Sequence, residues 1–230
     1  MPDFSSFTKK IGISFNNLDL LVEAFTHRSY LNEHPDYTVN HNERLEFLGD
    51  AVLDLAVTDF LFKKFPAKSE GELTRYYSAL VNSKSLTESA EMLNIDDFIL
   101  LSKGEPKNVG PARKKRLENT LEAIIGAIYL DSGYAAAETF IAKNIYNKID
   151  TIIATRSHHD AKSRVQEIVQ KEKNLTPKYK VLSEEGPVHA PSFTVALFVG
   201  EKEIAQGTGK TKQEAEQVAA ENALSTLKWS

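Results

Sequence analysis

Four acidic residues recur at helical spacing in the stretch NERLEFLGDAVLD, residues 42–54: Glu43, Glu46, Asp50 and Asp54. Spacings of three and four residues place these side chains on one face of an α-helix, where like charges repel one another. Apolar residues share that face and also fill the opposite one: Leu45, Phe47, Leu48, Val52, Leu55 and Val57. This pattern predicts a helix that is buried on most sides, and buried carboxylates need a cation or a proton. The alternative is a solvated acidic face that does no chemistry.

A second stretch, LENTLEAIIGAIYLD (residues 117–131), has a related pattern. Asn119 and Glu122 lie three residues apart and share a helical face with Ala123 and Gly126, whose small side chains would let another helix approach closely. If the two helices pack together, four oxygen-bearing side chains converge: Glu46, Asp50, Asn119 and Glu122. Oxygen ligands without Cys or His suit a hard cation such as Mg²⁺ or Mn²⁺.

The elements that must position these side chains are helices throughout residues 1–153. Apolar periodicity predicts helices over 17–25, 43–65, 116–133 and 135–153, with two more between 69 and 94. Ser69 is the expected N-cap of one of them, with Glu72 at the spacing of a capping box. Residues 103–111 are rich in Gly and Pro and predict a loop.

The pattern changes after a polar stretch at residues 154–159, which we interpret as a linker. Residues 160–230 predict the order α-β-β-β-α, with helices over 161–173 and 211–227 and three strands between them. Such an order makes a small α+β domain with both helices on one face of a three-stranded sheet. The fold class expected for the chain is therefore an all-α domain followed by a small α+β domain.

Composition limits the classes of protein and site. The 230 residues are 41% hydrophobic and include no cysteine, which excludes disulfides and thiolate metal sites. No secretory signal and no membrane-spanning run is recognisable, so we expect a soluble cytoplasmic protein without a membrane partner. The net charge of −4 disfavours a generally basic, non-specific nucleic-acid binder.

Several motifs carry a family resemblance. NERLEFLGDA (42–51) is similar to the signature of the ribonuclease III family, and FTHRSY (25–30), SEGELTRYYSALVN (69–82) and EAIIGAIYLDSGY (122–134) resemble its other landmarks in the same order. The resemblance implies a homodimeric, Mg²⁺-dependent endonuclease (Mn²⁺ can substitute) for double-stranded RNA. It implies 5′-phosphate and 3′-hydroxyl products, processing of rRNA and mRNA precursors, and no small-molecule substrate.

The resemblance also implies roles for particular residues. Asp50 and Glu122 would be catalytic, and the metal ligands would be Glu46, Asp50, Asn119 and Glu122. Glu43 and Glu70 match accessory acids that line the valley of the site. Asn119 departs from the family, which usually has Asp there. Asn119 is either a tolerated ligand or a change that leaves a cleavage-impaired RNA-binding protein of the same lineage.

Residues 160–230 resemble the double-stranded RNA-binding domain, on the segments PKYKVLSEEGPVHAPSF (177–193) and GTGKTKQEAEQVAA (207–220). The resemblance implies RNA contacts by Gln166, Glu167, His189, Lys210 and Lys212. It also implies that A-form shape is read over about 16 bp with little sequence preference. Gly207 and Gly209 are expected to turn the chain from the last strand into the last helix.

Three features keep a structural alternative. RKKR (113–116) is either a phosphate-binding patch or a solvated helix start. His27 and Arg28 are interpreted as a buried polar pair that holds helix ends, in preference to an acid and a phosphate clamp. Asp54 and Asp131 are interpreted as structural.

Overall fold

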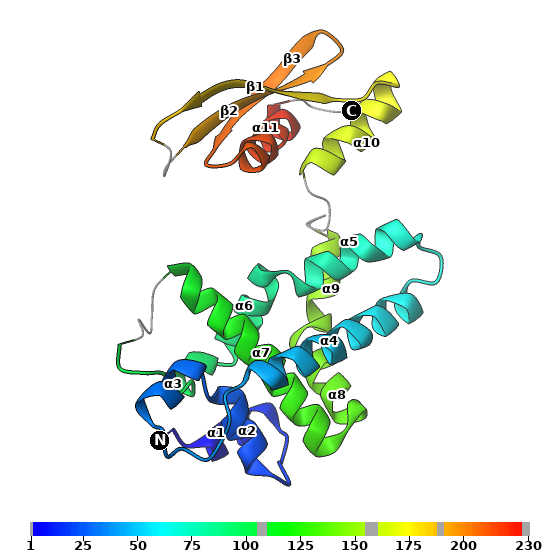
Figure 1. Ribbon diagram of the computed structural model, residues 1–230. Helices are drawn as coiled ribbons and strands as arrows, with labels where there is room; N and C mark the ends of the chain where they lie inside the picture. The colour runs from blue at the N-terminus through cyan, green and yellow to red at the C-terminus, as the bar shows by residue number, and fades with distance from the viewer. Residues whose placement is uncertain (1, 105–109, 155–160, 188–190, 227–230) are drawn as a thin grey trace. The chain divides into compact units, whose positions relative to one another are not determined.

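The computed structural model describes residues 2–104, 110–154, 161–187 and 191–226. The chain divides into two compact units, Met1–His158 and His159–Ser230 (Figure 1). Residues 155–159 of the predicted linker lie outside the described residues. No described helix has the length and apolarity needed to cross a membrane.

The first unit is helical, as the sequence predicts. Its elements are α1 Phe4–Ile11, α2 Leu18–Phe25, α3 Arg28–Glu33, α4 Glu43–Lys64, α5 Glu70–Val81, α6 Ser83–Met92, the 3₁₀ turn η1 Ile95–Asp97, α7 Gly110–Ser132, α8 Tyr134–Asn144, the 3₁₀ turn η2 Tyr146–Lys148, and α9 Ile149–Ala154. Its described part contains no strand, only a single β-bridge between Thr26 and Leu100. One hydrophobic core holds the helices together, with fully buried Phe7, Phe25 and Leu53 among its members.

The predicted helix limits hold in some places and fail in others. The capping box is confirmed, because Ser69 and Glu72 each accept a hydrogen bond from the other's backbone N–H. The helix expected over 135–153 is wrong as a single element, since it breaks after Asn144. The Asn144 side chain donates to the Phe140 carbonyl at 2.7 Å, and the Tyr146 hydroxyl donates to the Ala56 carbonyl at 2.6 Å in the core. This tertiary contact and the local side-chain bond override helix periodicity.

The two longest helices, α4 and α7, cross with their backbones almost touching (Figure 1). A Cβ atom added to Gly49 would lie 1.8 Å from the carbonyl oxygen of Glu122, and one added to Gly126 would lie 2.3 Å from that of Leu45. Only glycine fits at these two positions. The close approach predicted from the small residues of 117–131 is therefore confirmed, and Gly49 is the matching gap on the other helix.

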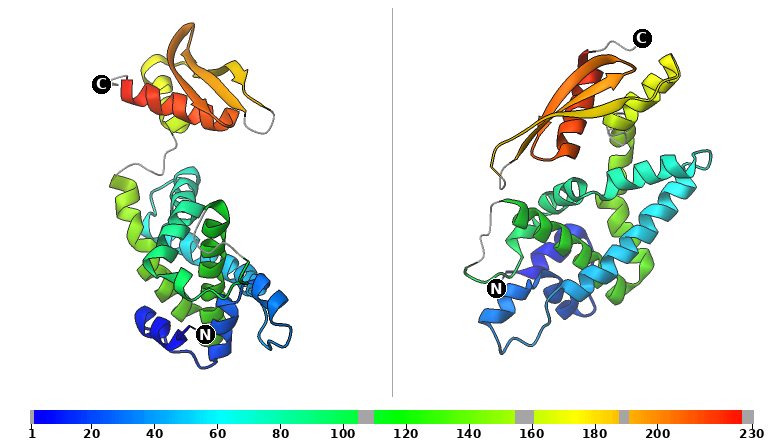
Figure 2. Two further views of the ribbon diagram at one scale, coloured as in Figure 1. Left: turned by 90° about the vertical axis from the view of Figure 1, so that its left-hand side faces the viewer. Right: turned by 45° about the horizontal axis from the view of Figure 1, so that its top comes forward.

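The second unit contains α10 Ala161–Lys173, β1 Lys178–Glu185, β2 Ser192–Val199, β3 Lys202–Gly209 and α11 Lys212–Thr226. The three strands form an antiparallel sheet in the order β1-β2-β3. Val165 of α10, Leu197 of β2 and Ala219 of α11 share one core, so both helices cover the same face, as Figure 2 shows. The predicted α+β fold is confirmed.

Gly209 ends β3 and α11 begins three residues later at Lys212, as expected, whereas Gly207 lies inside the strand. Neither glycine has a positive φ, so the turn does not depend on their conformational freedom. A Cβ atom at Gly207 would lie 2.2 Å from the backbone nitrogen of Ala219. These glycines therefore allow α11 to pack directly on the strand.

Candidate active site

A cavity of about 570 Å³ opens in the first unit beside the crossing of α4 and α7. Its lining includes the four predicted metal ligands: Glu46, Asp50, Asn119 and Glu122. The predicted accessory residue Glu43 also lines it. Glu70 does not belong to the described lining; it is exposed at the start of α5 and accepts a hydrogen bond from Thr74 Oγ1 at 3.2 Å.

Glu122 is the most deeply placed acid of the cavity. Its residue is only 7% exposed, and α7 is buried on every side from Thr120 to Ile128. Burial, followed by the charge of Asp50, raises the pKa of Glu122 to about 8. A buried carboxyl without a cationic partner holds its proton instead of a charge. A cation bound in the cavity would therefore stabilise the ionised form of Glu122.

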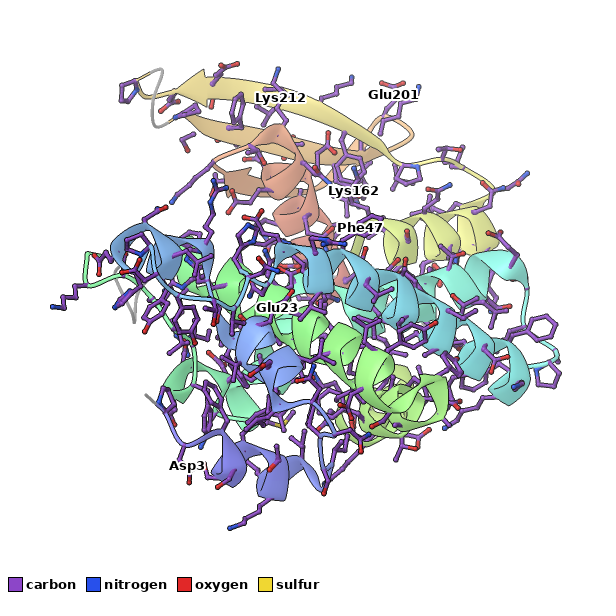
Figure 3. All side chains as sticks on the ribbon, turned by 60° about the horizontal axis from the view of Figure 1, so that its bottom comes forward. Asp3, Glu23, Phe47, Lys162, Glu201 and Lys212 are labelled. Carbon is purple, nitrogen blue, oxygen red and sulfur yellow. The ribbon has the colours of Figure 1, made fainter. Side chains whose placement is uncertain are left out.

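The acids of α4 are closer to solvent. Glu46 is half-buried and Asp50 is exposed, although desolvation raises the pKa of both carboxyls. The expectation that this helix is buried on most sides is wrong, because Phe47 is 81% exposed and Leu55 is 60% exposed. Phe47 is labelled in Figure 3. The α4 helix thus has an apolar face that no described residue covers.

Asn119 lies between the two helices' acids. Its side chain hydrogen-bonds to Glu46, which partly opposes the rise in the pKa of that carboxyl caused by burial. Its Oδ1 atom is buried and has no hydrogen-bond partner among the described residues. An orphaned buried acceptor is costly, and a cation or a bound water would satisfy it.

The donor set suits a hard divalent cation, because it offers three carboxylates and one amide oxygen and no sulfur or imidazole. Within the described chain, however, no three His, Asp or Glu side chains are gathered closely enough to hold a metal ion as they stand. A cation bound in this cavity would have to draw the carboxylates together and displace the proton of Glu122.

Sequence reasoning did not assign four polar residues of the described lining to the site: Asp54, Tyr77, Lys115 and Glu118. Asp54 lines the cavity, where the Tyr77 hydroxyl of α5 donates a very short hydrogen bond to its carboxylate. Asp131, in contrast, is structural as predicted, because it accepts the backbone N–H groups of Asn16 and Asn17. The basic run RKKR was the available signal for Lys115.

His27 and Arg28 contact helix starts, as predicted, but the expectation that the pair is buried is wrong for Arg28, whose side chain is exposed. His27 Nδ1 accepts the backbone N–H of Ser29 at 3.3 Å and caps α3. Arg28 Nη1 lies 3.4 Å from Glu43 Oε1 at the start of α4.

In the second unit, the four predicted RNA-contacting residues that the structure describes lie at exposed positions. Gln166 and Glu167 are exposed on α10, and Gln166 shares a shallow cavity with Thr211 at the start of α11. Lys210 follows β3, and Lys212 (Figure 3) opens α11 with its ammonium 5.5 Å from the centre of the Phe193 ring. His189 lies outside the described residues.

Residues 17–149 match the family model described as Ribonuclease-III-like, and residues 161–227 match the double-stranded RNA binding motif. The chain belongs to the ribonuclease III family. It is similar to Ribonuclease 3 of Carboxydothermus hydrogenoformans, with 48% identity over 223 residues that cover 97% of this chain and 95% of the relative. Ribonuclease 3 of Listeria monocytogenes is 41% identical over 227 residues, with 99% of both chains covered.

Solved structures agree with this assignment. The nuclease domain of ribonuclease III from Campylobacter jejuni matches with a TM-score of 0.57 and 41% identity, covering 64% of this chain and 97% of that one. As a ribonuclease III-family protein, the chain is an endoribonuclease with a helical nuclease domain and a C-terminal double-stranded RNA-binding domain.

Proposed function

We propose that the protein cleaves double-stranded RNA with Mg²⁺, or Mn²⁺ in its place, held by Glu46, Asp50, Asn119 and Glu122. The observation that carries this proposal is the convergence of a buried carboxyl from α7 with two carboxyls from α4 across a glycine-to-backbone crossing. A bound metal ion lowers the pKa of an attacking water and neutralises charge on the phosphate. The products would carry 5′-phosphate and 3′-hydroxyl ends.

The residues of the cavity have different proposed roles in the reaction. Asp50 and Glu122 are the proposed catalytic carboxylates, one near solvent and one buried. Asn119 offers a neutral oxygen through its unpartnered Oδ1 and fixes Glu46 by a hydrogen bond. Because Glu122 holds a proton up to about pH 8, loading the site must release that proton, and cation affinity should rise with pH. The accessory roles of Glu43 and Glu70 stay predictions.

The substrate class follows from the second unit. The double-stranded RNA binding motif supports duplex RNA as the partner, and we propose precursors of rRNA and mRNA as the RNAs that are cut. Gln166, Glu167 and His189 would reach the minor grooves, and Lys210 and Lys212 the phosphates between them. The cytoplasmic location that the sequence favours stays a prediction.

We further propose that the nuclease unit acts as a homodimer through the exposed face of α4. Phe47, Leu55 and Phe62 recur eight and seven residues apart, which places them on one helical stripe, and all three are exposed. Contiguous exposed apolar side chains mark interaction surfaces. A structure of the related Campylobacter jejuni nuclease domain is described by flexibility in a region involved in dimer formation.

Sedimentation velocity tests this interface. Leu55→Glu should shift the protein toward monomer, because a charge would be desolvated on association. Leu130→Glu, at an exposed apolar position on α7, is the matched control and should sediment as the wild type does. A dimer that survives Leu55→Glu unchanged would contradict the proposed interface.

The test of cleavage is an assay on a long duplex RNA with Mg²⁺, with Mn²⁺ and with EDTA, followed by analysis of the product ends. We expect cleavage that stops in EDTA. No product with either metal, while duplex binding persists, would refute the enzyme and favour the second candidate, a cleavage-impaired RNA-binding protein.

Asn119 is the feature that favours that second candidate, because an amide carries no negative charge. Asn119→Asp should therefore tighten Mg²⁺ binding or leave it similar, and cleavage should be maintained or increase. Weaker cleavage in Asn119→Asp would remove Asn119 from the proposed ligands.

A further inference from the structure

The basic run Arg113–Arg116 at the start of α7 divides into residues with different surroundings. Arg113 is held by two acids, with Nη1 2.6 Å from Glu91 Oε1 and Nε 2.7 Å from Asp96 Oδ2. Arg116 is buried. Arg113 therefore serves the fold, and Arg116 is enclosed where it lines a cavity of about 270 Å³, while the two lysines between them are exposed.

Of the two lysines, Lys115 is the one that faces the active site. It lies one helical turn before Asn119 and two before Glu122, on the same face of α7. It lines both the cavity of about 570 Å³ and a neighbouring cavity of about 270 Å³, and the two share Glu43, Glu46 and Asn119 as further lining. Lys115 thus belongs to the wall that the two cavities share.

The Lys115 ammonium is available to a ligand. Its side chain is 62% exposed, and its ion pair with Glu118 Oε2 spans 3.6 Å, longer than a direct hydrogen bond. Glu118 itself is only 13% exposed and accepts a hydrogen bond from Ser83 Oγ at 3.1 Å. Glu118 is consequently anchored from α6, while the lysine keeps donors for another partner.

Acidic residues dominate the lining of the cavity, so a phosphate could approach it only beside a cation such as the Lys115 ammonium. Six acidic residues line the larger cavity: Glu43, Glu46, Asp50, Asp54, Glu118 and Glu122. Lys115 is the one Lys or Arg among the described residues of that lining, and its charge lowers the pKa of Glu46, Asp50 and Glu122 against the effect of burial. An RNA strand entering a wall of carboxylates is repelled unless cations are interposed.

We propose that Lys115 binds a backbone phosphate of the RNA strand that enters this cavity, and is thus a substrate-binding residue of the cleavage reaction. The inference rests on the proposed function, because it needs duplex RNA at this cavity. A lysine suits the task, since its flexible stem carries a compact charge with three donors that can follow a phosphate. The metal ions and Lys115 would then neutralise different phosphates of one strand.

The first test compares Lys115→Ala, Lys115→Arg and Lys114→Ala in the full-length protein, by steady-state cleavage of a duplex over a range of KCl concentrations with Mg²⁺. We expect Lys115→Ala to raise KM about tenfold at moderate salt with little change in kcat. The slope of log KM against log salt concentration should become shallower by about one, the contribution of one phosphate contact. Lys115→Arg should restore KM, and Lys114→Ala should match the wild type. Equal KM values and slopes in Lys115→Ala and Lys114→Ala would overturn the proposal.

A second test does not depend on cleavage. A water-soluble acylating reagent labels lysines in the Glu122→Gln variant with Mg²⁺, with and without duplex RNA, and mass spectrometry reports the labelling of each lysine. RNA should protect Lys115 and leave Lys114 as reactive as before. Cleavage by the wild type together with an unprotected Lys115 refutes the role of Lys115 alone. Absence of cleavage with a protected Lys115 refutes the proposed enzyme and retains the RNA contact.

Discussion

Both units pack a helix directly on a neighbouring backbone through glycine, yet they expose their functional groups very differently. In the nuclease unit, Gly49 lies against the carbonyl of Glu122, and the contact encloses carboxyl groups in a partly buried cavity. In the RNA-binding unit, Gly207 lies against the backbone of Ala219, and the candidate contacts such as Lys212 remain exposed. The same packing device therefore supports two kinds of site.

The two kinds of site differ in the free-energy cost of holding a charged group. A carboxylate held away from water is destabilising until a cation binds it, so a substitution there changes both catalysis and folding. A solvated lysine costs little to maintain and contributes a salt-dependent increment to RNA binding. Substitutions of the cavity carboxyls in the first unit should consequently have large effects, and substitutions of the exposed lysines in the second unit should have small effects that vary with salt.

The largest effect is expected from Glu122→Gln. Gln keeps the shape of the side chain and one oxygen but loses the anionic charge, so the cleavage rate should fall at least about 10²-fold. Duplex affinity, measured by fluorescence anisotropy, should stay close to that of the wild type, because the RNA-binding unit is untouched.

Asp131→Asn is the control for a carboxylate outside the cavity, and it should retain cleavage even if stability falls. A Glu122→Gln variant that cleaves at the wild-type rate would show that the buried carboxyl has no part in catalysis. The contrast between the two units would then lose its basis.

The glycine contacts predict the next largest effect. Gly49→Ala and Gly207→Ala place a methyl group within 1.8 Å and 2.2 Å of backbone atoms, which have little room to move. Each should destabilise its own unit by about 1–3 kcal/mol or more. Gly71→Ala in α5 is the control, because nothing lies within 4 Å of its added Cβ, and it should be neutral or stabilising.

Thermal unfolding with a local probe in each unit measures these changes. Gly49→Ala should lower only the transition of the nuclease unit, and Gly207→Ala only that of the RNA-binding unit. If Gly49→Ala were as stable as Gly71→Ala, the close crossing of α4 and α7 would be in doubt.

The sequence predicts much of this arrangement because period and residue size are local properties. The 3.6-residue period gives the helical class of the first unit, and the spacing of Glu46, Asp50, Asn119 and Glu122 anticipates the cavity they share. The small residue Gly126 correctly predicts a close helix contact.

What the sequence could not supply depends on partners distant along the chain. The break after Asn144 follows from the bond between Tyr146 and Ala56, ninety residues apart. The hydrogen bond of Asp54 in the cavity depends on Tyr77 from another helix. The exposure of Leu55 depends on which helices cover α4. Periodicity reports that a residue is apolar, not whether a neighbour covers it.

A moderate effect is expected on the pH dependence of stability. The pKa of Glu122 is about 8 in the folded protein and near its ordinary value of 4.5 when unfolded. The folded state therefore binds the proton more tightly, and the stability from protonated Glu122 is lost as pH rises from about 5 to about 8. Glu122→Gln lacks this loss.

In EDTA, the Glu122→Gln variant should thus unfold at a higher temperature than the wild type near pH 9, by a few degrees. The two proteins should unfold at similar temperatures near pH 5. A temperature difference that does not change with pH would show that Glu122 is charged in the folded protein, and the nuclease unit would then resemble the RNA-binding unit in its tolerance of charge.

The smallest effect is expected from Lys212→Ala at the start of α11. The exposed ammonium would contribute one phosphate contact, so duplex affinity should fall a few-fold and the salt slope should become shallower by about one. Cleavage at low salt should survive, because the cavity of the nuclease unit is unchanged. Lys202→Ala, an exposed lysine at the β2–β3 hairpin, is the matched control and should preserve the wild-type slope. Equal affinity of Lys212→Ala and Lys202→Ala at moderate salt would remove Lys212 from the RNA contacts. A loss of cleavage at low salt would instead show that this exposed lysine affects cleavage as strongly as the buried Glu122 carboxyl.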